Sequence, residues 1–411
     1  MKNKFYNKFY NKNGKVTKLA IILIIIIILL SSIIFILIEI REKKEYETAL
    51  TLIDNLNVEY GSDIYVSNLI SKLNGTLIND YKIDTGENLG EKEVNFEYLC
   101  MHNKKRKKSF KINIIDTEKP KVFNQTNSFT FVKGSNKDLT TLFLSGDNCD
   151  TNPTRRIIGD YDFNEVNAYN LTFEIEDSSN NKTDVDFTLN IVDKINSKSS
   201  TTSTNNINFS DVSEEFSNKE IGIDVSEWQG EIDFQKVKDD GCKFVFIRVG
   251  YQKGKNGELY VDKYFEQNIK NALANNLDVG IYFYSCANNY EDATKQADFV
   301  IDKIKDYNFT LPVYFDWESW SYFNEYNVSF YSLNKIANIF ISKLNDNGYE
   351  SGLYSSKYYL DNIWYDEKYE NIWLAQYNDE VTYSGKYEYW QRCNTGRISG
   401  INGDVDIDIR E

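Results

Sequence analysis

The longest hydrophobic stretch of the chain covers residues 19–38 and contains two adjacent serines as its only polar positions. At about 1.5 Å of rise per residue, a helix of this length spans the roughly 30 Å hydrocarbon core of a bilayer. Six lysines and no acidic residue precede it, a pattern that keeps the preceding segment in the cytoplasm. A cleaved signal peptide would have a shorter apolar region followed by a site of small residues. The sequence therefore predicts a basic cytoplasmic tail at 1–18 and an uncleaved membrane anchor at 19–38, with the rest of the chain outside the cell.

The next region alternates apolar and polar residues with a period of two, and it repeats itself. Two stretches within residues 94–116 align, at one common shift, with two stretches within residues 171–193. This alternation is typical of half-buried antiparallel strands, joined as hairpins by polar turns such as 103–108. The basic run inside that turn fits a solvated loop better than a binding site for an anionic polymer. The sequence predicts two small β-sandwiches, at 41–116 and 117–194, which look like immunoglobulin-like modules.

Residues 195–219 are rich in Ser, Thr and Asn and poor in apolar residues, which predicts a flexible linker. Beyond it, apolar strand-like runs alternate with segments of helical periodicity, such as 265–273 and 293–304. The strand-like runs lie at 221–225, 244–249, 279–284, 312–316, 350–354, 371–375, 387–391 and 405–409. Near-continuous apolar strands alternating with helices indicate an α/β fold with a parallel sheet, here closed as a barrel over 220–411. In such barrels the chemistry takes place at the C-terminal ends of the strands.

Composition removes several classes of function. The formal net charge of −15 over 411 residues argues against a nucleic-acid partner, because phosphate binding needs an excess of Lys and Arg. His102 is the single histidine, which argues against Cys–His peptidases and against a catalytic zinc site. The five cysteines show no CxxC spacing and are interpreted as small buried thiols. We expect no metal and no cofactor, so any catalysis would fall to carboxylates.

Acidic residues end three of the predicted strands. Asp224 ends the first, Asp316 and Glu318 end the fourth, and Asp406 lies on the last, so the barrel should bring four acids to one mouth. Asp316 and Glu318 are two positions apart and therefore face the same side. Mutual repulsion gives such a pair one ionised and one protonated carboxyl near neutral pH, which is the division of labour that glycoside hydrolysis requires. Their rotamers decide between the retaining and the inverting separation, so the stereochemistry stays open.

Five segments together carry a resemblance to a known family. They are 222–230, 279–284, 312–318, 373–377 and 405–408, and through them residues 221–411 resemble glycoside hydrolase family 25, the Chalaropsis-type lysozymes. The resemblance implies an irregular TIM-like (β/α) barrel that hydrolyses the β-1,4 bond between N-acetylmuramic acid and N-acetylglucosamine. It implies Glu318 as the general acid and Asp316 as the group that assists the sugar's 2-acetamido group or activates water. It further implies that Asp224 and Asp406 orient the sugar and that the groove is lined by Tyr282, Tyr284, Gln376 and Tyr377.

The sequence departs from the family's pattern at three places. Arg248 begins Arg-Val-Gly-Tyr-Gln where many members have Lys-x-Ser/Thr-Glu-Gly, Phe283 stands for a frequent His, and Asp408 stands for a frequent Asn. These changes leave the four acids intact. We therefore expect a membrane-anchored muramidase on the wall side of the cell membrane, with peptidoglycan glycan strands as its partner and no protein partner indicated. The alternative is a catalytically weak or inactive surface protein that binds peptidoglycan.

Overall fold

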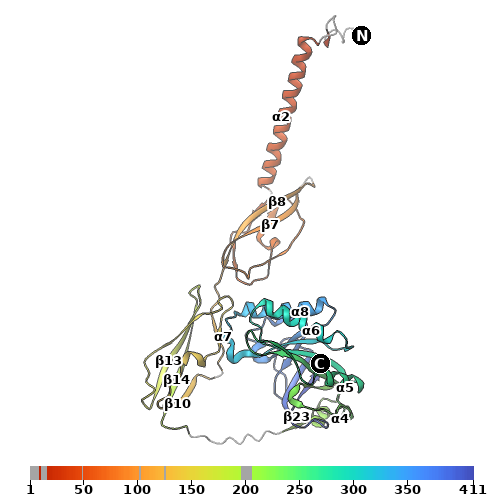
Figure 1. The fold of residues 1–411 in the computed structure, drawn as a ribbon. Helices are drawn as coiled ribbons and strands as arrows, with labels where there is room; N and C mark the ends of the chain where they lie inside the picture. The colour runs from red at the N-terminus through yellow and green to blue at the C-terminus, as the bar shows by residue number, and fades with distance from the viewer. Residues whose placement is uncertain (1–8, 11–15, 49, 101–102, 125, 196–205) are drawn as a thin grey trace. The chain divides into compact units, whose positions relative to one another are not determined.

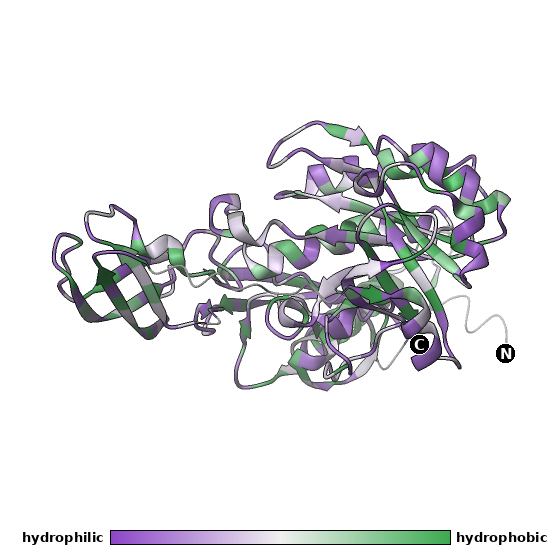
Figure 2. Cartoon of the chain, turned by 90° about the horizontal axis from the view of Figure 1, so that it is seen from below, coloured by the Kyte–Doolittle hydropathy of each residue, from purple (hydrophilic) through white to green (hydrophobic). Residues whose placement is uncertain are grey.

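The computed structural model describes residues 9–10, 16–48, 50–100, 103–124, 126–195 and 206–411. They form two compact units, Met1–Asp116 and Thr117–Glu411, each with hydrophobic cores of its own. Hydrophobic residues concentrate in the strands and helices, while the loops are mostly hydrophilic (Figure 2). His102, the single histidine, lies outside the described residues.

The first unit contains helix α2 (Lys18–Thr48), drawn in red in Figure 1. Its Lys18–Lys44 stretch is long and apolar enough to cross a membrane, and its most apolar part has no buried residue. Ser31 and Ser32 both donate their hydroxyl hydrogens to the Ile28 carbonyl, at 2.8 and 2.9 Å. These bonds satisfy the two polar groups within an otherwise apolar helix. The predicted helix is confirmed, and its role as a membrane anchor stays a prediction.

A first β-module follows the helix. Its four-stranded sheet has the order β2-β8-β7-β5, with β2 parallel to β8 and the other neighbours antiparallel. The elements are β1 (Leu50–Leu52), β2 (Asn57–Glu59), β3 (Ile64–Tyr65), η1 (Val66–Leu69), β4 (Ile70–Leu73), β5 (Gly75–Leu77), β6 (Lys82–Ile83), β7 (Gly90–Cys100) and β8 (Lys105–Ile115). Alternate residues of β7 and β8, among them Phe96, Tyr98 and Ile112, are buried in one core.

A second β-module repeats this arrangement in the order β10-β14-β13-β12, with β10 parallel to β14. Its elements are β9 (Lys121–Val122), β10 (Ser128–Val132), η2 (Leu139–Leu142), β11 (Ser145–Gly146), β12 (Thr154–Ile158), β13 (Asn167–Glu176) and β14 (Lys182–Val192). β14 begins 77 positions after β8 (182 − 105), and the same shift relates the start of β13 to that of β7 (167 − 90). The predicted repeat is confirmed as two β-sheet modules of one topology, and their immunoglobulin-like classification stays a prediction.

The polar turn predicted at 103–108 is wrong from residue 105 onward, because β8 begins at Lys105. The lysines there continue the strand's alternation on its solvent side. Lys105 and Lys107 both form salt bridges with Glu97 of the paired strand β7. The basic run is therefore a strand face whose charges are partly neutralised within the module.

The linker predicted at 195–219 is also folded in the part that the structure describes. Residues 196–205 lie outside the described residues, but β15 (Ile207–Asn208) pairs with the barrel and leads into helix α3 (Phe209–Glu215). Phe209 and Val212 are each 1% exposed and belong to the barrel's core. These two apolar residues anchor an otherwise polar segment to the barrel. Residues 206–219 therefore belong to the barrel domain.

The C-terminal domain is a closed, mixed β-barrel of eight strands in the ring order β23-β22-β21-β20-β19-β17-β16-β24. The strands are β16 (Glu220–Val225), β17 (Phe244–Gln252), β19 (Asp278–Ser285), β20 (Val313–Trp317), β21 (Ser351–Ser356), β22 (Ile372–Ala375), β23 (Tyr389–Arg397) and β24 (Val405–Arg410), while β18 (Leu259–Val261) pairs with β17 outside the ring. The barrel prediction is confirmed, with one correction. β24 runs antiparallel to both of its neighbours, so the sheet is mixed rather than parallel.

Amphipathic helices surround the ring. They are α4 (Phe234–Asp239), α5 (Phe265–Ala274), α6 (Tyr290–Ile304), α7 (Phe323–Tyr326), α8 (Phe330–Asp346) and α9 (Lys357–Leu360), with the 3₁₀ turns η3 (Glu227–Gln229), η4 (Ser319–Tyr322) and η5 (Asp366–Lys368). The longest of them, α8, is capped by Ser329, whose hydroxyl accepts from the Ser332 amide, and it buries Leu333, Ile336 and Phe340 against the barrel.

Aromatic rings fill the floor of the barrel and leave its mouth to polar groups. Phe246 stacks on Trp373 at a centroid distance of 4.5 Å and packs edge-on against Tyr314 at 5.3 Å. Gly280 makes room for this layer, because a Cβ there would come within 2.2 Å of the Phe246 ring. The packed floor supports the side chains at the C-terminal strand ends above it.

Candidate active site

The Asp316–Glu318 pair lies at the end of β20, in the middle of the domain. Along this strand Phe315 and Trp317 point outward into the core under the helices, while Tyr314 joins the interior layer. Asp316 shares the inward face and is 4% exposed. Glu318 follows the end of the strand, where η4 begins, and is exposed to solvent. The alternation of the strand thus places a buried acid beneath an accessible one.

The four predicted acids meet in one pocket of about 260 Å³. Seven of the eight predicted site residues line it: Asp224, Tyr282, Tyr284, Asp316, Glu318, Tyr377 and Asp406. The eighth, Gln376, lines an adjoining pocket of about 520 Å³. Glu318, Tyr354 and Tyr377 border both pockets, so the two form a continuous groove with Glu318 between its halves.

A hydrogen-bond network fixes Asp224. Its Oδ2 accepts from Nε2 of Gln391 at 2.7 Å, and Oε1 of Gln391 accepts from the hydroxyls of Tyr354 (2.8 Å) and Tyr377 (2.9 Å). Asp406 lies directly opposite Asp224 in the antiparallel pairing of β24 with β16. Gln391 was not predicted as a site residue, because a glutamine on an apolar strand shows its role only once the strand register is known.

Two further residues, one beneath the pocket and one in its lining, were not predicted as site residues. Asp408, noted only as a departure from the family, is fully buried and accepts from the Trp373 indole N–H at 2.8 Å. It follows Asp406 by two positions, and this period of two was a usable signal. Trp228 lines the pocket and is 81% exposed, so its ring is available to a ligand. Its position shortly after the strand that carries Asp224 could have identified Trp228 as a site residue from the sequence.

Burial and mutual repulsion set the charge of the central pair. The pKa of Asp316 is raised well above its usual range, first by burial and then by the charge of Glu318, while Arg248 opposes the shift. Burial also raises the pKa of Glu318, against hydrogen bonds from Tyr354 and Asp316. A hydrogen-bond interaction between the two carboxyl groups raises the pKa of Asp316 and lowers that of Glu318, so a proton on the pair is favoured on Asp316. Such a pair can give up and take back a proton near neutral pH.

The three acids next to the pair, Asp224, Asp406 and Asp408, also have raised pKa values, so their surroundings favour the protonated form. Burial, followed by the charges of Asp406 and Asp408, raises the pKa of Asp224 well above its usual range. Burial, with the charge of Asp406, does the same for Asp408. For Asp406, burial and the charge of Glu318 raise the pKa to about 7. A site with this many raised carboxyl pKa values is typical of proton-transfer chemistry.

Arg248 is the one cation among the residues that line this pocket. It is 8% exposed and forms salt bridges with the fully buried Asp262 at 2.7 Å and with Glu227 at 2.9 Å. Asp262 also accepts from the Glu227 amide at 2.9 Å, which ties η3 and the neighbouring Trp228 to the pocket rim. The departure noted at Arg248 therefore supports the rim and keeps a positive charge near Asp316.

Residues 223–401 match the sequence profile described as glycosyl hydrolases family 25. The autolytic lysozyme of Clostridium acetobutylicum is 27% identical over 189 residues, which are 46% of this chain and 54% of that protein. Lysozyme M1 of Streptomyces globisporus is 28% identical over 202 residues, 45% of this chain and 65% of that protein. The chain thus spans about half the length of the first of these relatives.

One similar solved structure is the modular autolysin LytC from Streptococcus pneumoniae in complex with a synthetic peptidoglycan ligand. It is 24% identical, with a TM-score of 0.43 over 58% of this chain and 56% of that one. The family match begins within β16 and ends after β23, so it contains the segments that carry Asp224, Asp316 and Glu318. It leaves the two β-modules unassigned. The C-terminal half of the chain thus contains a domain of glycoside hydrolase family 25.

Proposed function

We propose that this protein is a muramidase, which hydrolyses the β-1,4 bond between N-acetylmuramic acid and N-acetylglucosamine in peptidoglycan. The observation that carries the proposal is the proton-sharing pair of Asp316 and Glu318 in the pocket of a family 25 domain. Raised pKa values favour the retention of a proton on this pair, as a general acid requires. The lysozymes among the relatives support the same substrate class.

In the proposed reaction the shared proton first moves from Asp316 to Glu318, and Glu318 then donates it, because it is the solvent-accessible member of the pair. The proton passes to the glycosidic oxygen as the bond from that oxygen to the anomeric carbon breaks. The 2-acetamido oxygen of the same sugar then bonds to the anomeric carbon. Ionised Asp316 accepts a hydrogen bond from the acetamido N–H and balances its positive charge. Water finally attacks the anomeric carbon and gives a proton to Glu318, while the bond from that carbon to the acetamido oxygen breaks and restores the acetamido group.

The contact between the two carboxyl groups favours this assisting role for Asp316. An inverting enzyme needs about 6.5 to 9.5 Å between its carboxyls to hold a water, and a direct nucleophile needs about 5 to 5.5 Å. A hydrogen-bonded pair is closer than either separation. The proposed mechanism therefore predicts retention of configuration at the anomeric carbon.

The groove supplies sugar-binding surfaces on both sides of Glu318. Tyr282, Tyr284 and the exposed Trp228 lie in one pocket, and Gln376 lies in the other. Aromatic rings offer flat apolar faces for pyranose rings, and the neighbouring polar groups can bond their hydroxyls. Two sugars that meet at Glu318 would place their shared glycosidic oxygen at the proton donor.

The decisive test is turnover of purified peptidoglycan by the full-length protein, with Glu318→Gln as the matched control. After borohydride reduction, a muramidase leaves reduced N-acetylmuramic acid at the new chain ends. Reduced N-acetylglucosamine would assign the cleavage to the other glycosidic bond and overturn the proposed specificity. Binding to peptidoglycan with no new reducing ends would instead favour the alternative of an inactive binding protein.

We also propose that α2 is a single-pass anchor with the barrel on the wall side of the cytoplasmic membrane. The apolar helix and the six lysines at 1–18 support this orientation. Protease added to cells stripped of their wall should remove the barrel and leave a membrane-bound N-terminal fragment. A soluble secreted product that begins after residue 38 would show that the helix is a cleaved signal sequence.

A further inference from the structure

The second β-module and the barrel share an apolar contact within the unit Thr117–Glu411. Phe123 of the module is 7% exposed, belongs to the barrel's core and packs edge-on against Phe330 of α8 at a centroid distance of 5.5 Å. Leu144 packs on the same core. A Cβ at Gly146 would come within 2.7 Å of Phe323 and 2.8 Å of Phe330. The module therefore lies so close to α7 and α8 that it has no room for a side chain at this position.

The module also caps α8. The carbonyl oxygens of Asp147 and Asn148 accept from the amides of Phe330 and Tyr331, the first two residues of that helix, at 2.8 and 3.2 Å. The first amides of a helix have no acceptor within the helix itself. The loop from the module supplies these acceptors.

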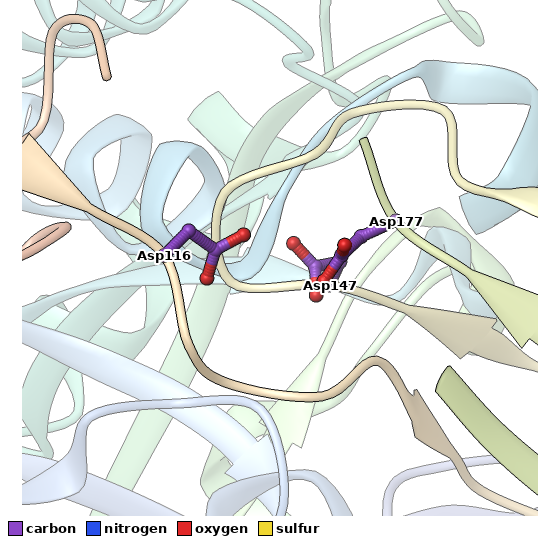
Figure 3. A group of neighbouring side chains, drawn as sticks. All are labelled: Asp116, Asp147 and Asp177. Atoms are coloured by element: carbon purple, nitrogen blue, oxygen red, sulfur yellow. The ribbon is translucent and has the colours of Figure 1, made fainter. Parts of the chain in front are cut away.

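Two acids fix the loop and its neighbour. The carboxylate of Asp147 accepts two backbone hydrogen bonds from its own turn, at 2.8 and 2.7 Å. Asp177 accepts two in the next turn, both at 2.8 Å. Figure 3 shows these two side chains close together, drawn with Asp116. The turn that each of them closes accounts for its position, and we assign no cation to the group.

A side-chain pair extends the contact to α7. Arg155 of β12 donates from Nη2 to Oδ1 of Asn324 at 3.2 Å, and Asn324 donates from Nδ2 to the Phe143 carbonyl at 3.2 Å. Ser145 holds the same guanidinium through its hydroxyl (3.0 Å) and its carbonyl (3.1 Å). Burial lowers the pKa of Arg155 while the charge of Asp150 opposes the shift. Arg155 is thus a partly desolvated charge with fixed partners on both sides of the contact.

Helix α7 in turn contacts both chain neighbours of Glu318. Phe323 and Tyr326 pack edge-on against Trp317 at centroid distances of 6.1 and 5.8 Å. The Tyr326 hydroxyl donates to the Ser319 hydroxyl at 3.3 Å. The backbone on either side of Glu318 therefore depends on where α7 lies.

We infer that the second β-module positions the Glu318 carboxyl, acting through Arg155, Asn324 and helix α7. The inference rests on the proposed function, in which Glu318 moves the proton. With four residues, α7 is too short to hold its place by its own hydrogen bonds, so its position comes from packing on both sides. Arg155 and Asn324 are positioning residues, since they line neither pocket of the groove.

Arg155→Ala and Arg156→Ala form a matched pair of variants. Arg156 is the next residue of β12, and it pairs with Glu174 and Glu176 of the module's own sheet. In the full-length protein, Arg155→Ala should lower kcat roughly 10- to 100-fold, because displacement of a reacting group by about 1 Å costs up to that much. KM should stay nearly unchanged, since the groove lining is untouched. Arg156→Ala should match the wild type in both constants.

Gly146→Ala tests the same contact by a different route, because its methyl group would push the module away from Phe323. It should share the loss of kcat, and hydrogen exchange at the Phe330 and Tyr331 amides should quicken in both variants. Wild-type kcat in both, a raised KM with unchanged kcat, or unchanged exchange in a variant with reduced turnover would each overturn the inference. An inactive wild-type protein counts against the proposed function itself, whereas an active wild type with an equally active Arg155→Ala counts against the inference alone.

Discussion

The acids of the barrel mouth and the acids of the β-modules lie in opposite environments. At the mouth, burial and neighbouring negative charge raise the pKa values of Asp224 and Asp316. On the modules, paired lysines lower the pKa values of Glu97 and Glu176. The pocket contains one cation, Arg248, among its several acids. The surroundings of Glu97 and Glu176 thus favour their ionised forms, whereas the surroundings of Asp224 and Asp316 favour their protonated forms.

The difference shows which acids need an explanation beyond folding. A surface acid with a lysine partner changes the free energy of folding only slightly in either direction. A buried acid beside other acids is unfavourable to the folded state, so its presence points to chemistry unless backbone amides satisfy it, as they do for Asp147 and Asp177. Four acids of the second kind lie in or beneath one groove, next to the accessible Glu318: Asp224, Asp316, Asp406 and Asp408. Substitutions in the two regions should therefore have effects of different kind and size.

The largest effect is expected at the accessible acid of the mouth. Glu318→Gln keeps the shape of the side chain and removes its transferable proton, so turnover should fall roughly 100- to 10,000-fold. The thermal midpoint should change little, because Glu318 is exposed to solvent and the substitution keeps the shape of its side chain. Release of reducing ends and a melting curve measure the two effects. Near-normal release of reducing ends would remove Glu318 from the mechanism.

A comparable loss is expected for Asp316→Asn, because the amide cannot balance the charge on the acetamido group. The double variant Asp316→Asn, Glu318→Gln should be hardly worse than either single variant, since groups that act as one unit fail together. Initial rates on solubilised peptidoglycan provide the comparison. If the two losses multiplied, the residues would be acting independently.

Asp406 should give the mouth a pH-dependent stability. Its pKa rises from 3.8 to about 7 on folding, so the folded state favours the protonated form. The stabilisation is complete below pH 3.8 and is lost as the pH rises to about 7, with an upper bound on the order of 4 kcal/mol at 1.36 kcal/mol per unit. Asp406→Asn should flatten this slope in unfolding midpoints measured between pH 4 and about 7.5. An unchanged slope would mean that Asp406 is not the group that titrates.

The smallest effect is expected at Glu97 of the first module. Lysines lower its pKa, so its contribution to stability is present above its unfolded pKa of 4.5 and disappears as the pH falls, the opposite sense to Asp406. Glu97→Gln should leave turnover unchanged and lower the thermal midpoint slightly at low salt. Added salt should abolish the difference, because screening weakens exposed pairs. A loss of turnover would give this module a role that the comparison does not predict.

Much of the site was readable from the sequence, because strands of a barrel deliver their end residues to one place. The period of two along 312–318 was enough to put Asp316 and Glu318 on the inward face, and the repeat of the modules followed from the same alternation. The pairing of Asp224 with Asp406 depends on the antiparallel direction of β24, and the sequence of β24 does not show in which direction it runs. Gln391 owes its role to Asp224, which is far away in the chain, and Arg248 owes its role to Asp262, which follows β18.

The contact between the second module and the barrel could not be predicted from the local pattern of apolar and polar residues. The polar composition of 195–219 predicted a flexible linker, and β15 with α3 instead joins the barrel. Phe123 and Gly146 look like ordinary strand and turn residues until the aromatic rings of α7 and α8 are placed against them. Contacts between domains depend on complementary surfaces, and the sequence of one surface does not show which other surface will pack against it.

The pairing of the barrel's first strand with its last has a consequence for how such a domain can be reused. Glu220 at the start of β16 lies opposite Arg410 at the end of β24, and the two side chains form a salt bridge. The polypeptide therefore comes into the barrel and goes out of it at one edge. A unit with adjacent termini can be grafted into another protein at a single point, and it tolerates circular permutation when its ends are joined. Gene fusion at this edge would leave the strand ends that carry the acids untouched, but Glu318 would keep its position only where the contact of the second module with α7 and α8 is moved along with the barrel.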